Sequence, residues 1–320
     1  MGAEPKVLKE GAIYFRIVGV PSILISLMFI FGSILRAAGD TKTPMKVSWW
    51  INLVHIGLVY ILIFGFSHIP GMGVAGAALA TVIVRILGTG MLYYKIKQSS
   101  FSFSLLHKQA ESPSEYKSLI LLSSPAAIER LIMRLGQIVY YGLIVRLGTE
   151  TYAAHTIAGN IETFSYMPGY GLSIAAATLT GQSLGAGKER DAYQYGMLTT
   201  YIAVIFMSFI GILLFFLAPW FAAWFTTEQS AIDLVVTALR IDAFAQPALA
   251  VGLVMAGALQ GAGDTKSPLY STAVGMWVIR VAGVYVLGIV FGHGIAGIWL
   301  SIAIDLCARA IFLFFVSAGY

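Results

Sequence analysis

The sequence predicts an all-α, multi-pass membrane protein with an internal repeat. Its residues are 58% hydrophobic and only 11% charged, whereas charged residues make up about a quarter of an ordinary globular domain. The mean hydropathy is +0.83. The segment LRAAGDTKTP at 35–44 returns 224 positions later as LQGAGDTKSP at 259–268, each time between two long apolar stretches. Internally repeated helical bundles are the usual build of secondary transporters.

Nine apolar segments are long enough to cross a bilayer, which requires roughly 20 residues of α-helix. They lie at about 11–36, 46–68, 73–96, 117–147, 151–184, 191–221, 231–260, 268–291 and 294–317. The fourth, fifth and sixth segments exceed the length that a span requires. We therefore expect these three helices to be tilted, kinked or extended beyond the bilayer.

The positions of the positive charges predict the topology. Lys42, Lys95, Lys188 and Lys266 all lie at connections on one side of the predicted bundle. Positively charged connections usually face the cytoplasm, so we expect the chain to start outside and its C-terminus to lie inside. The protein should reside in the cytoplasmic membrane, in direct contact with lipid. A nucleic-acid partner is not expected, because no soluble domain is available to hold a basic patch.

The one long hydrophilic stretch, 98–116, is interpreted as a cytoplasmic linker between two lobes. Residues 117–320 would then form a complete C-terminal lobe of six helices, and residues 1–97 the second, three-helix half of an N-terminal lobe. Projected backward by the repeat offset, the start of the second repeat falls before Met1. We therefore expect Met1 to match an internal position of a longer ancestor. The alternative is an asymmetric protein that never had the three missing helices.

Glu129 in the fourth span is the strongest candidate for a functional residue. Charged groups inside a span cost about 2.5–3.5 kcal/mol each on insertion scales, so they tend to face a cavity or a partner. Met133, Gln137 and Tyr140 follow Glu129 on the same helical face. This set suits a bulky organic cation, which protonation of Glu129 would release. Alternatively, Glu129 forms a permanent ion pair with an arginine and only holds the lobe together.

The fifth span is unusually polar, so it should line water. Glu162 and Tyr166 share one face with His155, and Asn160 lies on the adjacent face. Pro168 removes a backbone hydrogen bond in the middle of this helix and could act as a hinge. His155 is interpreted as a buried core residue more readily than as a proton relay.

Two further groups of polar residues occur in other spans. Asn52 and His55 lie three residues apart in the second span, where His55 could titrate near neutral pH or remain a buried neutral donor. Arg280, Asp305 and Arg309 in the last two spans are interpreted as a structural ion-pair set, because Asp305 and Arg309 are spaced i, i+4.

The two AGDTK loops are interpreted as stiff hairpins rather than binding sites. Gly39 and Gly263 would adopt the left-handed conformation that ends a helix, and Asp40 and Asp264 would accept backbone N–H groups of the turn. Pro44 and Pro268 would lie at the start of the next helix, where a missing N–H is tolerated. No metal-ligand cluster, catalytic triad or phosphate-binding loop is evident in the sequence, so neither an enzyme nor a cofactor is expected.

Several motifs together resemble the multidrug and toxic compound extrusion (MATE) family. They are the paired Leu-x-x-Ala-Gly-Asp-Thr-Lys-x-Pro loops, the segment from Gly73 to Thr81, Tyr166-Met-Pro168-Gly169, and the stretch from Ala175 to Ala186. The resemblance covers essentially the whole chain. It implies two six-helix lobes that export organic cations in exchange for H⁺ or Na⁺.

The resemblance also assigns roles to individual residues. Glu129, four residues after Pro125, matches an acid that many members use for cation coupling. Some members carry an aspartate where this chain has Leu249, which argues against a sodium site made of two acids in the C-terminal lobe. The N-terminal acid that other members use lies in a helix that this chain does not contain.

We therefore expect a secondary antiporter that exports organic cations against H⁺ or Na⁺ by alternating access. It would act as a monomer and use no cofactor besides the coupling ion. Two alternatives are a flippase of lipid-linked precursors, which would need a groove lined with inward-facing arginines, and a truncated remnant that inserts into the membrane but does not transport.

Overall fold

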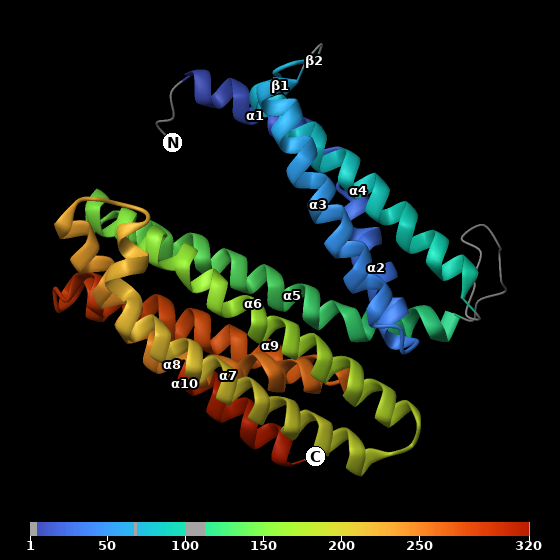
Figure 1. The fold of residues 1–320 in the computed structure, drawn as a ribbon. Helices are drawn as coiled ribbons and strands as arrows, with labels where there is room; N and C mark the ends of the chain where they lie inside the picture. The colour runs from blue at the N-terminus through green and yellow to red at the C-terminus, as the bar shows by residue number, and fades with distance from the viewer. Residues whose placement is uncertain (1–4, 67–68, 100–112, 320) are drawn as a thin grey trace. The chain divides into compact units, whose positions relative to one another are not determined.

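The computed structural model describes residues 5–66, 69–99 and 113–319. The chain divides into two compact units, Met1–Ala110 and Glu111–Tyr320, and each is built almost entirely of helices (Figure 1). Most of the predicted linker, 98–116, lies outside the described residues, although Gln98 still belongs to a helix of the first unit and Pro113 begins a helix of the second.

The first unit consists of four helices and a short hairpin. The helices are α1 (Pro5–Gly19), α2 (Ile23–Ala37), α3 (Lys42–Phe64) and α4 (Gly73–Gln98), and the antiparallel hairpin pairs β1 (Gly65–Phe66) with β2 (Ile69–Pro70). Buried apolar side chains of α2, α3 and α4 form the core: Phe31, Leu35, Val47, Ile51, Val84, Leu92 and Ile96. The second predicted span ends earlier than expected, at Phe64, because Gly65 adopts a φ of 83°.

The first predicted span is a broken helix rather than a single straight one. Helices α1 and α2 meet at an angle of 44°, with Pro21 in the break between them. Proline lacks the N–H that would continue the helix. Helix α4 stabilises the break, because Arg85 Nη1 donates to the carbonyl of Val18 (3.4 Å) and Thr89 Oγ1 donates to that of Leu24 (3.2 Å).

The second unit contains the remaining helices. They are α5 (Pro113–Val145), α6 (Thr149–Gly185), α7 (Glu189–Ala223), α8 (Gln229–Gly261), α9 (Lys266–Val274), two π-helical segments η1 (Gly275–Val281) and η2 (Val284–Val290), and α10 (Gly294–Ala318). Helix α8 is central to this unit, since it packs on α6, α7 and α10 (Figure 1). Each of the nine predicted spans therefore falls on a helix, or on consecutive helical segments, of the described chain.

The predicted span at 268–291 is not a regular α-helix. Its middle and end widen into η1 and η2, and such π-turns frequently occur at functional sites. These segments lie in close contact with α10: a side chain at Gly275 would collide with Asp305, and one at Gly283 would collide with Ser301. The hydroxyl of Ser301 donates to the carbonyl of Arg280 (3.0 Å).

The two halves of the repeat share their backbone structure in detail. In both AGDTK loops the aspartate N–H donates to a leucine carbonyl five residues earlier at 2.9 Å, Asp40 to Leu35 and Asp264 to Leu259. Gly39 and Gly263 have φ values of 91° and 89°. The aligned glycines Gly76 and Gly297 each lie against a backbone carbonyl of the preceding helical segment, that of Leu62 and that of Leu287. The predicted duplication is therefore visible in the structure as well as in the sequence.

The aspartates of the hairpin loops accept backbone N–H groups of the turn, as predicted. Oδ1 of Asp40 accepts the N–H of Thr43 at 2.9 Å, and Oδ1 of Asp264 accepts the N–H groups of Lys266 and Ser267, each at 3.0 Å. Hydrogen bonds from the hydroxyl and then the N–H of Thr43 hold the pKa of Asp40 below its usual value. The ionised form is thus favoured in the folded loop, and this contribution is lost only as the pH falls through that lowered pKa. Pro44 and Pro268 are each the third residue of their helix, α3 and α9.

The surface of the described helices is suited to a bilayer. Six helices of the described residues are long and apolar enough to cross a membrane, or seven if α1 and α2 form one bent span. Helices α5 and α6 are also long, at 33 and 37 residues, but they are not among these six. Large apolar side chains such as Phe216, Phe315 and Val278 are exposed along the spans, where they can contact lipid.

Helices α6 and α8 cross at unusually short range. Gly257 and Gly261 of α8 lie directly against the carbonyls of Ser173 and Ala177 of α6, the small-residue pattern that lets membrane helices approach closely. Ser173 Oγ also donates to the carbonyl of Leu253 across this contact (2.7 Å).

Replacing Gly257 with alanine should destabilise the second unit, because the new Cβ would overlap the carbonyl of Ser173. Overpacking of this kind typically costs about 1–3 kcal/mol. The matched control is Gly252→Ala on the same helix, where nothing lies within 4 Å of the new Cβ and the change should be neutral or slightly stabilising. Thermal unfolding of the purified protein in detergent measures both, and equal unfolding temperatures for the two variants would refute the close contact.

Candidate functional site

Glu129 lies at the centre of α5 and is held by neutral hydrogen-bond donors. It is half-buried. Its carboxylate accepts from Gln260 Nε2 of α8 at 3.3 Å and from Thr272 Oγ1 of α9 at 3.0 Å. No ion pair to Glu129 is found among the described residues, so the structural alternative of a permanent arginine pair has no support here.

Behind Glu129 lies a buried ion-pair cluster. Asp305 of α10 has no exposed side-chain surface and pairs with Arg280 of η1 at 2.7 Å and with Arg309 at 2.6 Å. Arg309 Nη1 also donates to Thr272 Oγ1 at 3.4 Å, so Thr272 connects the cluster to Glu129. The three charged residues therefore form the expected structural set, and this set adjoins the functional candidate.

Tyr140 belongs to the core rather than to an open face of α5. It is only 4% exposed, and the guanidinium of Arg280 lies 6.0 Å from the centre of its ring. The predicted stripe of α5 is therefore divided: Met133 and Gln137 are half-buried, whereas Tyr140 is covered. Gln137 accepts a hydrogen bond from Arg134 Nη1 at 2.9 Å.

His155 of α6 is buried among aromatic rings. It is 3% exposed, and its ring lies 5.2 Å from that of Tyr141 and 5.6 Å from that of Trp299. Both ring nitrogens lack a hydrogen-bond partner in the described structure. This environment agrees with the interpretation of His155 as a core residue.

The polar face of α6 is partly open. Glu162 and Tyr166 are half-buried and Asn160 is exposed. The rings of Tyr166 and Tyr170 are stacked, with centroids 5.9 Å apart and planes inclined by 16°. Helix α6 continues through Pro168 as far as Gly185, so the proline is accommodated within an otherwise continuous helix.

One acidic residue of α8, Asp242, was not among the site residues predicted from the sequence. Asp242 is 1% exposed and lies near the middle of the helix, where its Oδ2 accepts a hydrogen bond from Gln246 Nε2 at 2.6 Å. The criterion applied to Glu129, an acid inside a predicted span, would have selected Asp242 as well. The charges of Glu162 and Arg280 both act on it.

Two of the predicted site residues, Asn52 and His55, lie in the first unit. Asn52 is exposed on α3 and donates to the carbonyl of Ser48 at 2.8 Å. His55 is half-buried, with Nε2 3.4 Å from the hydroxyl of Thr81 on α4. The predicted site residues of α5 and α6 lie in the second unit, which also contains Asp242 and the ion-pair cluster.

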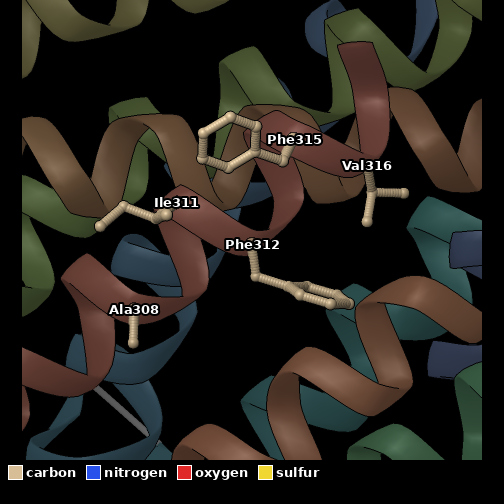
Figure 2. Close-up of a pocket in the computed structure, with 5 residues that line it drawn as sticks. All are labelled: Ala308, Ile311, Phe312, Phe315 and Val316. Atoms are coloured by element: carbon tan, nitrogen blue, oxygen red, sulfur yellow. The ribbon is translucent and has the colours of Figure 1, made fainter. Parts of the chain in front are cut away.

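Helix α10 also bears a hollow whose lining, unlike the charged interior, is entirely apolar. It has a volume of about 670 Å³ and is lined by Ala308, Ile311, Phe312, Phe315 and Val316, which recur along one stretch of the helix (Figure 2). All of these side chains are apolar, so the hollow offers dispersion contacts but no group for ion binding. No group of residues suited to hold a metal ion is found in the described chain.

The fold and the interior together define a class of protein. A repeated bundle of apolar helices with acids and arginines buried in its core is the architecture of a membrane transporter. The family model MatE matches residues 1–61 and 125–286. The chain belongs to the MATE family, which confirms the resemblance seen in the motifs, and it is a multi-pass membrane transporter rather than an enzyme.

Individual relatives agree with this assignment. The chain is 33% identical over 312 residues to a protein of Thermotoga maritima named "Probable multidrug resistance protein NorM", covering 96% of this chain and 67% of that protein. It is 27% identical to the transporter YisQ of Bacillus subtilis, covering 98% of this chain and 69% of that protein. Its fold matches a MOP superfamily transporter from Pyrococcus furiosus with a TM-score of 0.90 at 21% identity, covering all of this chain and 71% of that one.

Removal of the buried carboxylate should destabilise the second unit. In Asp305→Asn, Arg280 and Arg309 lose their shared negative partner, and breaking a buried ion pair typically costs about 3–5 kcal/mol. The control is Asp233→Asn, an exposed residue of α8 whose loss should change stability by less than about 0.5 kcal/mol. Thermal unfolding in detergent provides the measurement, and an Asp305→Asn protein as stable as the control would show that the cluster is dispensable.

Proposed function

We propose that this protein is a secondary active multidrug exporter that exchanges organic cations for H⁺ or Na⁺ across the cytoplasmic membrane by alternating access. Membership of the MATE family supports the proposal, as does the 33% identity to a protein named as a multidrug resistance protein. The distribution of basic residues between connections supports a cytoplasmic C-terminus. We further propose that the transporter acts as a monomer.

The environment of Glu129 is the observation on which the proposal rests. An ionised carboxylate in the middle of a span is costly unless it is compensated, and the groups that contact Glu129 directly, Gln260 and Thr272, are neutral. The carboxylate can therefore be neutralised by a proton, by Na⁺ or by an organic cation. Because one negative charge balances one positive charge at a time, these cations compete, and competition is the basis of exchange.

Side chains near Glu129 along α5, and others on α6, offer suitable contacts for an amphipathic cation. Met133 is half-buried one helical turn after Glu129 and supplies a polarisable thioether. Tyr166 and Tyr170 supply stacked aromatic rings, whose faces attract cations. The arrangement therefore suits large, flat, positively charged compounds.

The alternative function is the export of an anionic lipid-linked precursor. Arg130 and Arg134 of α5 are exposed and could contact phosphate groups. The buried arginines, Arg280 and Arg309, share a single acid, Asp305, which offsets one of their two positive charges. By contrast, Glu129, Glu162 and Asp242 have no arginine in an ion pair among the described residues. The balance of charges therefore favours a cationic substrate.

The proposed function predicts that Glu129→Gln abolishes gradient-driven efflux, because the amide cannot exchange cations. The native protein would be reconstituted into liposomes, and efflux of ethidium would be measured under an imposed H⁺ gradient and, separately, an imposed Na⁺ gradient. The matched control is Glu150→Gln, at an exposed acid in the first turn of α6, which should retain efflux. Unchanged efflux by Glu129→Gln would contradict the mechanism, and inactive wild-type protein would favour the non-transporting alternative.

A further inference from the structure

Asp242 and Gln246 form an isolated polar pair inside the second unit. They lie one turn apart on α8, and both are buried, at 1% and 0% exposure. Gln246 Nε2 donates to Asp242 Oδ2 at 2.6 Å. Helix α7 packs tightly on this pair, since a Cβ on Gly211 would lie 2.6 Å from the carbonyl of Ala243 and 3.3 Å from Cβ of Gln246. The pair therefore has little freedom to turn toward solvent.

The other oxygen of each side chain lacks a partner. Asp242 Oδ1 and Gln246 Oε1 are both buried and accept no hydrogen bond from any described residue. An ionised carboxylate and an amide oxygen can only accept hydrogen bonds, so neither can satisfy the other. Leaving a buried polar atom unpaired typically costs about 1–3 kcal/mol, and more when the group is charged.

A single proton on Asp242 would give both unpaired oxygens, Asp242 Oδ1 and Gln246 Oε1, a hydrogen bond. A protonated carboxyl group gains an O–H donor, and a carboxylic acid can pair with a primary amide through two parallel hydrogen bonds. The amide N–H then donates to Oδ2, as it does in the structure, and the new O–H donates to the amide oxygen. We propose that Asp242 is an exchangeable proton site, in which Oδ1 carries the proton and donates it in a hydrogen bond to Oε1 of Gln246.

The charges around Asp242 come from several elements. Glu162 of α6 and Arg280 of η1 act on it electrostatically. The charged residues of α10, Asp305 and Arg309, are engaged in the ion-pair cluster. The titratable side chains of the other helices that pack on α8 lie elsewhere: those of α7 lie between Glu189 and Tyr201, and Tyr270 of α9 is exposed. Among the described acids, Glu162 is therefore the one whose charge acts on Asp242, which is itself fully enclosed by the helices around it.

The half-buried carboxylate of Glu162 has no hydrogen-bond or ion-pair partner in the described chain. Two ionised carboxylates in one apolar interior repel each other, so an ionised Glu162 would oppose ionisation of Asp242. A cation that binds at Glu162 removes this repulsion, so Asp242 can ionise and release its proton. Proton release would thus be linked to cation binding at a site separate from Glu129, and this role in exchange rests on the proposed function.

Infrared difference spectroscopy of the purified native protein tests the proton site without requiring transport. We expect a carbonyl band of a buried protonated carboxyl group at neutral pH. Asp242→Asn, whose amide has the shape of the neutral acid, should abolish this band. Asp233→Asn is the matched control, because Asp233 also accepts from a glutamine four residues away on α8, Gln229 at 2.8 Å, but is exposed. The band should persist in this control and in Glu129→Gln.

Gln246→Leu tests whether Gln246 accepts the hydrogen bond of protonated Asp242 or only fills space beside it. Loss of the amide should leave the band in place but shift it to higher frequency, because the acid loses its hydrogen-bond acceptor. If Asp242→Asn does not fold, this frequency shift alone assigns the band to Asp242.

A wild-type protein without the band, or a band unaffected by both Asp242→Asn and Gln246→Leu, would overturn the proposal. A normal band in a protein that shows no efflux would count against the proposed function and leave the proton site intact.

Discussion

The buried carboxylate of Asp305 is the interaction on which the second unit depends. It pairs with two arginines from different elements, Arg280 of η1 and Arg309 of its own helix. Without it, two positive charges would remain in an interior that is otherwise apolar, at a cost of several kcal/mol. The widened π-turns of η1 and the glycine at 275 allow the two helices to approach closely enough for this pairing. Through Thr272 the same cluster reaches Glu129.

The balance of charge inside this unit has a direct consequence for transport. Arg280 and Arg309 share one acid, whereas Glu129, Glu162 and Asp242 contact no arginine directly in the described chain. Acids therefore outnumber arginines among these interior residues of the described chain. We interpret the excess as the means by which the unit binds protons or other cations, with Glu129 engaged by neutral donors and Asp242 by one amide.

The sequence was sufficient to predict the spans, the duplication and the capped loops, because each depends on local signals. Apolar length defines a span, and glycine with aspartate defines the turn at Gly39 and Gly263. It did not predict the break at Pro21, which depends on donors from α4 that lie about 65 residues away. Nor did it predict the π-turns, which lie against α10. Tyr140 was expected on an open face, but packing with Arg280 buries it. Asp242 could have been predicted as a candidate, because it is an acid inside a predicted span. Its hydrogen bond with Gln246 could not, because the side-chain geometry is known only from the structure.

In the proposed mechanism, the transported cation and the coupling ion compete for acids inside the bundle. This competition can be measured as equilibrium binding of a fluorescent organic cation such as ethidium to the purified protein, at a series of pH values and Na⁺ concentrations. The affinity should fall as the pH is lowered, as Na⁺ is raised, or both, because each neutralises the acids that attract the cation. An affinity that depends on neither pH nor Na⁺ would show that no such competition takes place.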